Sequence, residues 1–293
     1  MKKLDKLFNR SKRIKIDDNS KLVIMSDCHR GSGDNYDNFI KNQNIFNSAL
    51  RYYYNNDFIY IELGDGDDMW EVSDYKEIVD EHLESFLEMK KFNDTNRLIM
   101  LYGNHDITKR RSKIINKIFM TYYDKSAKEE KELLKDLKIY ESVVANYKDR
   151  EIFMLHGHQV DFLNSTLWRI SRFLVRHIWR KLEFIGIKDP TSAAKNYSIT
   201  KTVEKKLQRW SIKNEKIIIA GHTHRPIFPH NGESLYFNDG SCVHPNGITC
   251  LEIENGNITL VRWFFSIDEN NVLSTERIIL AGSEPIESFF NNE

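Results

Sequence analysis

The 293-residue sequence has little of several features that would mark whole classes of protein. It contains three cysteines, an odd and sparse count that argues against a disulfide scaffold and fits a reducing cytoplasm. No apolar run reaches the roughly 18 residues of a membrane-spanning helix, and the basic first residues lack the apolar core of a signal peptide. The formal net charge is zero, which argues against a nucleic-acid partner. We therefore expect a cytoplasmic protein.

Proline is also scarce, with five residues in the chain, and no linker rich in glycine, proline or serine divides the sequence. We therefore expect one domain with an insertion. Residues 1–20 are predicted to be a basic, poorly ordered leader. The domain is expected to span 21–265, with a helical insertion over about 159–215, and 266–293 are expected to form an edge strand and a tail.

The sequence does have five short apolar runs, each followed by Asp, Asn or His side chains. Runs of this length are typical of strands buried on both faces. Ligands gather at the carboxyl ends of such strands, so we expect one sheet edge to collect the polar side chains. The runs are 22–25, 58–61, 98–101, 152–155 and 217–220. The clusters that follow are Asp27-Cys28-His29, Gly64-Asp65-Gly66-Asp67-Asp68, Gly103-Asn104-His105-Asp106, His156-Gly157-His158 and Gly221-His222-Thr223-His224.

Segments with helical periodicity alternate with these runs, which is the pattern of an α/β fold. The expected helices cover 36–55, 76–91 with Ser73 as N-cap, and one or two charged helices within 108–138. Beyond Pro226 the pattern predicts a second, antiparallel sheet, with a hairpin turn at Asn255-Gly256. Its expected strands are 234–237, 248–254, 258–265 and 272–280.

The spacing of the polar residues predicts a metal site. Asp27 and His29 stand two apart, so strand alternation places them on one side and packs Cys28 in the sheet. His222 and His224 repeat this spacing. Oxygen and imidazole ligands without thiolates suit Mn, Fe or Zn. They exceed the needs of one tetrahedral zinc and would serve two metals if a carboxylate bridges them. Such sites direct a metal-bound hydroxide at phosphorus.

In this order, the five motifs resemble those of the calcineurin-like metallophosphoesterases over about residues 21–265. The resemblance implies a four-layer α/β/β/α sandwich and two divalent metal ions, with Mn expected first and Fe or Zn as alternatives. The residues that carry it are Asp27-x-His29, Gly64-Asp65-x-x-Asp68, Gly103-Asn104-His105-Asp106, His156 and Gly221-His222-x-His224.

The same resemblance implies a role for each motif residue. His105 would stabilise the phosphoryl group and protonate the leaving oxygen, and Asp106 would orient His105. Asp65 would bridge the two metals. The other implied metal ligands are Asp27, His29 and His224 for one ion, and Asn104, His156 and His222 for the other.

Other candidates each have a functional and a structural interpretation. Arg30 would clamp a phosphate or lie on the surface after a tight turn. Trp70 would line the substrate pocket or pack at its rim, and His158 would contact substrate or metal or be structural. Asp68 would support the ligands or form a turn, and Asp67 is expected to be solvated. The histidines outside the motifs are expected to be structural or exposed: His82, His177, His230 and His244.

The spacing of basic and apolar residues in 162–187 predicts an amphipathic basic helix. It would pack on the core with a solvated charged face, or act as a lid or membrane-surface element toward anionic headgroups. The layout is similar to the UDP-2,3-diacylglucosamine pyrophosphatase branch of the family. That branch has Arg where this chain has His105, and Gly-Asp where it has Gly157-His158. The residues of the basic stripe are Arg169, Arg172, Arg176 and Arg180.

We therefore expect a two-metal hydrolase that cleaves a phosphodiester or pyrophosphate bond by attack of a metal-bridging hydroxide. Its partner would be a phosphorylated small molecule or a nucleotide- or lipid-linked substrate, and nucleic acid is not expected. Its location would be cytoplasmic, with or without peripheral contact to an anionic membrane. The alternative is a catalytically silent scaffold of this fold that binds a partner protein. A scaffold usually loses metal ligands, and this sequence retains all of them.

Overall fold

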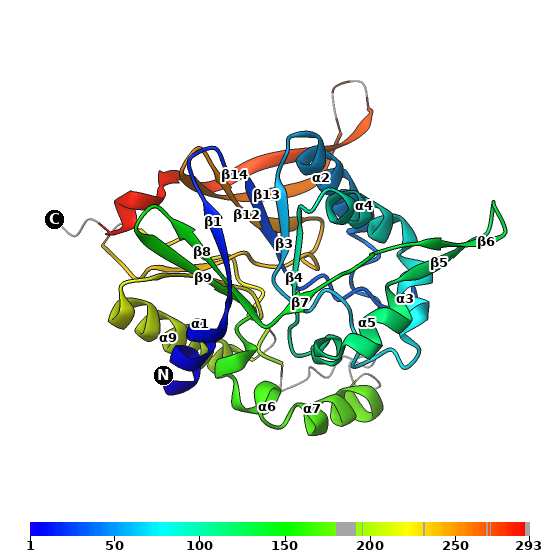
Figure 1. The fold of residues 1–293 in the computed structure, drawn as a ribbon, viewed down its shortest axis with the longest axis horizontal. Helices are drawn as coiled ribbons and strands as arrows, with labels where there is room; N and C mark the ends of the chain where they lie inside the picture. Colours follow the sequence, from blue (N-terminus) through cyan, green and yellow to red (C-terminus); the bar gives the residue numbers. More distant parts are fainter. Residues whose placement is uncertain (180–191, 195, 231, 268, 270, 291–293) are drawn as a thin grey trace.

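Two β-sheets form the centre of the molecule and helices cover their outer faces (Figure 1). The computed structural model describes residues 1–179, 192–194, 196–230, 232–267, 269 and 271–290. The layers are helix, sheet, sheet and helix. This confirms the α/β fold with two central sheets.

The seven-stranded sheet has the order β14-β13-β12-β2-β3-β4-β7. Four of its strands pair in parallel from β2 to β7, and three join by antiparallel pairing from β12 to β14. The strands are β2 (Leu22–Met25), β3 (Ile59–Glu62), β4 (Leu98–Leu101), β7 (Ile139–Tyr140), β12 (Ile248–Glu254), β13 (Asn257–Ile267) and β14 (Leu273–Pro285).

The five-stranded sheet has the order β1-β8-β9-β10-β11. Only its β8–β9 pair is antiparallel. The strands are β1 (Lys12–Ile16), β8 (Ser142–Tyr147), β9 (Arg150–Leu155), β10 (Ile217–Ala220) and β11 (Tyr236–Asn238). A separate hairpin of β5 (Thr121–Asp124) and β6 (Glu129–Glu132) projects from the body of the molecule (Figure 1).

Helices pack on the outer face of each sheet through apolar side chains. The seven-stranded sheet carries α2 (Gln43–Asn55), α3 (Tyr75–Glu81), α4 (Leu83–Asp94) and α5 (Ser112–Ile118). The five-stranded sheet carries α1 (Lys2–Arg10) and α9 (Tyr197–Asn214). The short helical elements are η1 (Ile107–Arg110), η2 (His158–Val160), α6 (Phe162–Ser165), α7 (Trp168–Leu174), the π-helical η3 (Val175–Trp179) and η4 (Ile286–Phe290). None of the helices described is long and apolar enough to cross a membrane.

The strands are apolar throughout because both of their faces are buried. In β2, Val23 and Met25 belong to the cluster under the helices of the seven-stranded sheet. Leu22 and Ile24 belong to the cluster between the two sheets. Successive side chains of a strand point to opposite faces, so each face of β2 has its own core. The continuous apolar run in the sequence follows from this double burial.

All five expected strands are present, but they do not share one sheet edge. β2, β3 and β4 belong to the seven-stranded sheet, whereas β9 and β10 belong to the other. The expectation of a single edge is wrong, because an apolar run shows that a strand is buried without showing which sheet contains it.

The antiparallel pairing expected after Pro226 is confirmed for β12, β13 and β14, but these strands do not form a second sheet. β12 pairs with β2, so β12 to β14 extend the seven-stranded sheet. β11 joins the other sheet. The hairpin turn itself is confirmed, since Asn255 and Gly256 join β12 to β13 with φ of 53° and 71°.

Several other expectations change with the structure. The leader is ordered, because Leu4, Leu7 and Phe8 are buried on α1 and β1 pairs with β8. The segment expected to be charged helices contains α5 and then the β5–β6 hairpin. The helix expected after Ser73 is capped by Asp74 and divides into α3 and α4, and the one expected from residue 36 begins at Gln43. The expected insertion over 159–215 contains α6, α7, η3 and α9, and the part of the expected basic helix from Arg180 onward lies outside the described residues.

Candidate metal centre

The carboxyl ends of the two sheets meet and bring all five motifs together. His222, which follows β10, donates its backbone N–H to Asp27 Oδ2 at 2.8 Å. His156, which follows β9, places Nδ1 3.1 Å from the carbonyl of Leu63 beyond β3. These two contacts tie one sheet to the other directly behind the polar side chains.

Several of the candidate ligands have left-handed backbone conformations. This region is disfavoured for residues with a Cβ, by an amount on the order of 1 kcal/mol each. Strain of this kind persists where the surroundings fix the backbone, and it is concentrated at functional sites. The positive φ angles are 53° at Asp27, 50° at His29, 50° at Asp65, 68° at His222 and 54° at His224.

Two glycines allow the motif loops to approach one another. A Cβ at Gly103 would lie 2.1 Å from Asp65 Oδ1, and one at Gly221 would lie 2.1 Å from Ser26 Oγ. No side chain fits at either position without displacing a neighbour of the site. The glycines in these motifs are therefore required by close packing.

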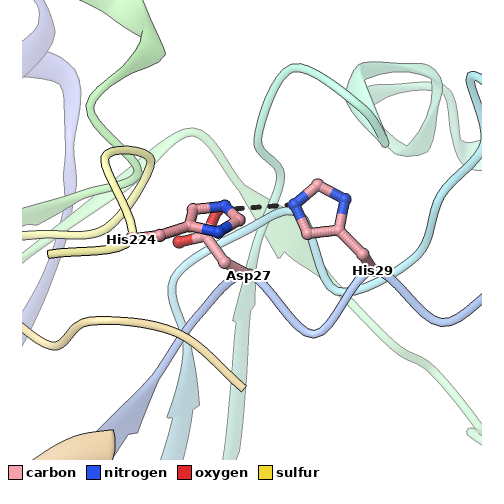
Figure 2. Close-up of side chains that lie close together, drawn as sticks. All are labelled: Asp27, His29 and His224. Atoms are coloured by element: carbon pink, nitrogen blue, oxygen red, sulfur yellow. Dashed lines mark ion pairs between the residues drawn. The ribbon is translucent and has the colours of Figure 1, made fainter. Parts of the chain in front are cut away.

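Asp27, His29 and His224 form the first candidate set of ligands. His224 Nε2 lies 3.1 Å and His29 Nε2 3.7 Å from Asp27 Oδ1, and the three side chains point toward one another (Figure 2). The other oxygen of Asp27 accepts hydrogen bonds from Ser26 Oγ and His222 N, at 2.5 Å and 2.8 Å. Potential ligand atoms of this set lie within 4.8 Å of one another.

A second set consists of Asp65, His156 and His222, with Asn104 alongside. His156 Nε2 lies 3.1 Å from Asp65 Oδ2, while its Nδ1–H donates to the carbonyl of Leu63. This hydrogen bond assigns Nε2 as the free ligand atom. Asp65 also belongs to a third group with His29 and His105, so its carboxylate lies between the two sets.

Four buried atoms at this centre form no hydrogen bond of regular geometry with any described residue. For two of them the polar neighbour is itself a candidate ligand, since Asp27 Oδ1 faces His224 and His156 Nε2 faces Asp65. Buried polar atoms normally have partners, and those without one call for an explanation. Carboxylate, amide and imidazole atoms are the donor types that bind divalent transition metals. The site therefore fits divalent metal ions. The four atoms are Asp27 Oδ1, His29 Nε2, Asn104 Oδ1 and His156 Nε2.

The charges of the centre shift the pKa values of its members in opposite directions. Burial would raise the pKa of Asp65, but the positive charges of His156 and His105 outweigh it and lower that pKa. Burial would lower the pKa of His156, but the carboxylates of Asp65 and Asp27 raise it to about 9. In the metal-free protein a proton on His156 therefore offsets part of the carboxylate charge, and a metal ion must displace it.

His105 is held by Asp68 and Trp70. Its Nδ1 lies 3.0 Å from Asp68 Oδ1, and the ring of Trp70 stacks on it at 4.4 Å between centroids with 21° between planes. Asp68 Oδ2 lies 3.5 Å from His29 Nδ1, so one carboxylate contacts both imidazoles. Asp68 also accepts a hydrogen bond from Glu71 N, so it supports the site and forms the turn.

The expectation that Asp106 orients His105 is wrong. Asp106 Oδ1 accepts hydrogen bonds from Gly103 N at 2.7 Å and Asp65 N at 3.3 Å. Its Oδ2 pairs with Lys109 Nζ at 2.6 Å. Asp106 thus holds the backbone of two motif loops. Its position next to His105 in the sequence did not predict a contact between them, because consecutive side chains point in different directions.

Arg30 and Asp67 are both buried, contrary to expectation. Arg30 Nε pairs with Asp67 Oδ1 at 2.6 Å, and its Nη2 pairs with Glu62. Lys109 Nζ lies 2.7 Å from Asp67 Oδ2, and all four side chains are fully inaccessible to solvent. Arg30 therefore cannot clamp a phosphate, and Asp67 is not solvated. A buried cation requires carboxylate partners, and the position of Arg30 in the sequence did not show that Glu62 and Asp67 would pair with it.

A cavity of about 370 Å³ opens in front of the candidate ligands. Trp70 lines it as predicted, although its contact with a substrate stays a prediction. His158 does not line it: this side chain is buried, 5.5 Å from the ring of His156, and its burial lowers its pKa well below the usual value. Val175 and Trp179 of η3 form part of the wall.

His244 also lines the cavity, although no motif marks it in the sequence. Its Nε2 has no hydrogen-bond partner among the described residues. Burial, followed by the charge of His224, lowers the pKa of His244 to about 4, so this imidazole is neutral near pH 7. Its approach to the site depends on long-range folding of the segment after β11, and no local pattern could have indicated it.

The chain was compared with known families, sequences and structures. Residues 20–226 match the family model described as calcineurin-like phosphoesterase. A predicted phosphoesterase from Streptococcus pneumoniae is similar at 14% identity and TM-score 0.35, over 89% of this chain and 97% of that one. Vps29 from Chaetomium thermophilum has 11% identity and TM-score 0.41, over 90% and 99%. A putative 5'-nucleotidase from Staphylococcus aureus has 13% identity and TM-score 0.38, over 94% and 56%. No curated protein sequence matched the chain.

Proposed function

The chain belongs to the calcineurin-like phosphoesterase family, and from this premise we propose that it is a hydrolase dependent on two divalent metal ions. Its substrate would be a phosphodiester or a pyrophosphate, linked to a nucleotide or a lipid. The observation that carries the proposal is the convergence of four buried donor atoms without hydrogen bonds of regular geometry on one centre beside the cavity.

The chain offers a ligand set for each ion. Asp65 lies between the sets and would contact both ions. Two ions bound here would supply a nucleophile from water at neutral pH and offset the phosphoryl charge. The mixture of oxygen and imidazole donors supports Mn, with Fe or Zn as alternatives. The proposed ligands are Asp27, His29 and His224 for one ion, and Asn104, His156 and His222 for the other.

His105 is the proposed general acid. Because Asp68 engages Nδ1, the other ring nitrogen is left to hold the proton that the leaving oxygen requires. His105 lines the cavity, and Trp70 covers one face of its ring. This arrangement keeps the imidazole in a single orientation beside the reacting group.

We extend the proposal to a lipid-linked substrate similar to that of the UDP-2,3-diacylglucosamine pyrophosphatases, and to a cytoplasmic site of action at an anionic membrane. The support is the insertion, which places Val175 and Trp179 in the cavity wall and exposes Ile170 and Phe173 on α7. A catalytically silent scaffold would not need to retain every donor of the centre, so the complete set favours the hydrolase.

The test is hydrolysis of an aryl phosphodiester by protein reconstituted with Mn²⁺, Fe²⁺ or Zn²⁺. Asp65→Asn is expected to lower the rate by at least about a hundredfold, the order found when one group that stabilises a transition state is removed. Asp149→Asn makes the same change on a side chain that is 86% exposed, and it should leave the rate unchanged. If wild type hydrolyses no phosphoester above the Asp65→Asn level with any of these metals, the proposed function is wrong.

A further inference from the structure

Arg176 of the insertion binds the loop of residues 66–72. Its Nε donates to the carbonyl of Trp70 at 2.7 Å. Its Nη2 donates to the carbonyls of Met69 at 3.0 Å and Val72 at 2.7 Å. One guanidinium thus gathers three carbonyls from a single turn of the chain. The planar fork of arginine suits this arrangement because its donors lie on separate nitrogens, whereas the three donors of a lysine ammonium all lie on one nitrogen.

The loop that Arg176 holds also carries the two side chains that contact His105. Asp68 pairs with Nδ1 of His105, and Trp70 stacks on its face. Trp70 is 2% exposed, so its indole is fixed between the imidazole and the surrounding side chains. The turn is closed internally as well, since Val72 N donates to the carbonyl of Asp68. The position of His105 therefore depends on the shape of this turn.

The element that carries Arg176 also forms the wall of the cavity. Arg176 lies in the π-helical η3, and Val175 and Trp179 of the same element line the cavity. π-Helical turns are frequently found at functional sites. The contact that fixes the 66–72 turn therefore also fixes part of the wall of the cavity that His105 lines.

We propose that Arg176 is a positioning residue for phosphoester hydrolysis, which aligns His105 by holding the turn that carries Asp68 and Trp70. Proton transfer to the leaving oxygen would then require the insertion to be docked on the loop. This inference rests on the proposed function for its kinetic consequence, but the contact itself can be tested without catalysis.

A matched control lies one turn earlier on the same insertion. The guanidinium of Arg172 packs on the ring of Trp168 at 5.4 Å, and that residue lies outside the 66–72 loop. Arg172→Ala removes the same side chain as Arg176→Ala from a neighbouring position. A difference between the two variants therefore reports the contact with the loop and not a general loss of positive charge from the insertion.

The structural test is amide hydrogen exchange of peptides covering 66–72 in the metal-free protein. Arg176→Ala is expected to accelerate exchange at Glu71 and Val72 severalfold, because both amides donate to Asp68 within the turn. Arg172→Ala should leave the exchange at wild-type rates. Equal exchange of this loop in wild type and Arg176→Ala would overturn the proposal.

The kinetic test uses aryl phosphodiesters whose leaving groups differ in basicity. Arg176→Ala is expected to slow hydrolysis about 10- to 100-fold for basic leaving groups, part of the 10²–10⁴-fold that a positioned acid contributes. The loss should be small for an acidic leaving group, which needs no proton. Millimolar guanidinium ion should restore part of the rate, whereas Arg176→Lys should restore little of it.

The double variant Arg176→Ala/His105→Ala should be no slower than His105→Ala alone, since both changes remove the same proton transfer. An equal loss for all leaving groups, or an additive loss in the double variant, would contradict the proposal. If Arg176→Ala does not fold, as judged by its melting curve, Arg176→Lys is examined with the same two readouts. If wild type hydrolyses no phosphoester, the proposed function fails. The hydrogen-exchange result still shows whether Arg176 holds the 66–72 turn.

Discussion

At the residue scale, the proposed chemistry depends on one imidazole held by two neighbours. Asp68 contacts the Nδ1 edge of His105, and Trp70 covers its face. His105 lies beside the ligands, yet its Nδ1 is already engaged by a carboxylate. Its Nε2 is left for the proton transfer that we propose. Because imidazoles held through Nδ1 also bind metals through Nε2, metal binding by His105 is the alternative that has to be tested.

Replacement of His105 by alanine is expected to keep a near-normal metal content and to slow hydrolysis by about 10²–10⁴-fold. The loss should shrink with a good leaving group, because that oxygen departs without a proton. His177→Ala, a change at an exposed histidine of η3, serves as the control and should match wild type. Loss of bound metal in His105→Ala, measured by elemental analysis, would show instead that His105 is a ligand.

At the element scale, the structure changes the interpretation of the basic insertion. Arg169 is exposed on α7 beside Ile170 and Phe173, which are 56% and 59% exposed. Arg176 instead points inward and binds backbone carbonyls. The predicted basic stripe is therefore divided, with Arg169 on the surface and Arg176 directed inward. The division arises because the helix becomes π-helical at Val175, which changes the direction of the side chains that follow.

The exposed part of α7 is expected to bind anionic vesicles through its cationic and apolar side chains. Arg169→Glu/Arg172→Glu should abolish sedimentation with such vesicles and leave hydrolysis of a small diester intact. Lys205→Glu/Lys213→Glu makes the same change of charge on exposed positions of α9 and should retain binding. Binding should weaken with salt, since exposed charges are screened within roughly 8 Å at physiological ionic strength. Failure of wild type to sediment at low salt would exclude this role.

The sequence predicted those elements whose signals are local. The apolar runs identified β2 and β4 at their observed bounds, and Asn255-Gly256 identified the turn between β12 and β13. The leader was missed because its many lysines obscured the spacing of Leu4, Leu7 and Phe8 on α1. The β5–β6 hairpin was missed because its charged residues carry no strand alternation and are held by cross-strand pairs such as Lys131 with Asp124.

At the scale of the whole molecule, the site forms only where the two sheets meet. The motif residues could be listed from the sequence because each directly follows a buried strand. Their supporting contacts could not, since they join segments far apart in the chain: Arg30 with Glu62, or Arg176 with the 66–72 loop. Such partners are set by packing of the complete fold, and no local spacing encodes them.

The closeness of the ligands also makes the stability of the metal-free protein depend on pH. The carboxylates raise the pKa of folded His156 to about 9, against about 6.5 when unfolded. A raised pKa contributes stability that is fully present below pH 6.5 and is lost as the pH rises through 9. The melting temperature of the metal-free protein should therefore fall by several degrees over this interval, from a contribution on the order of 3 kcal/mol.

His156→Gln removes this titrating group and should flatten the dependence of the melting temperature on pH. His230→Gln, at an exposed position, should retain the slope of wild type. A melting temperature of the metal-free wild type that is constant from pH 6.5 to 9 would show that the imidazole is not held by the carboxylates as described.

The central claim is that two metal ions share Asp65, and the most direct measurement is metal content per chain after reconstitution with Mn²⁺ and removal of excess ion. Wild type is expected to retain two ions and Asp149→Asn likewise two, whereas Asp65→Asn should lose occupancy at both positions because its carboxylate lies between the two ligand sets. Retention of at most one ion by wild type, or of two ions by Asp65→Asn, would contradict the account.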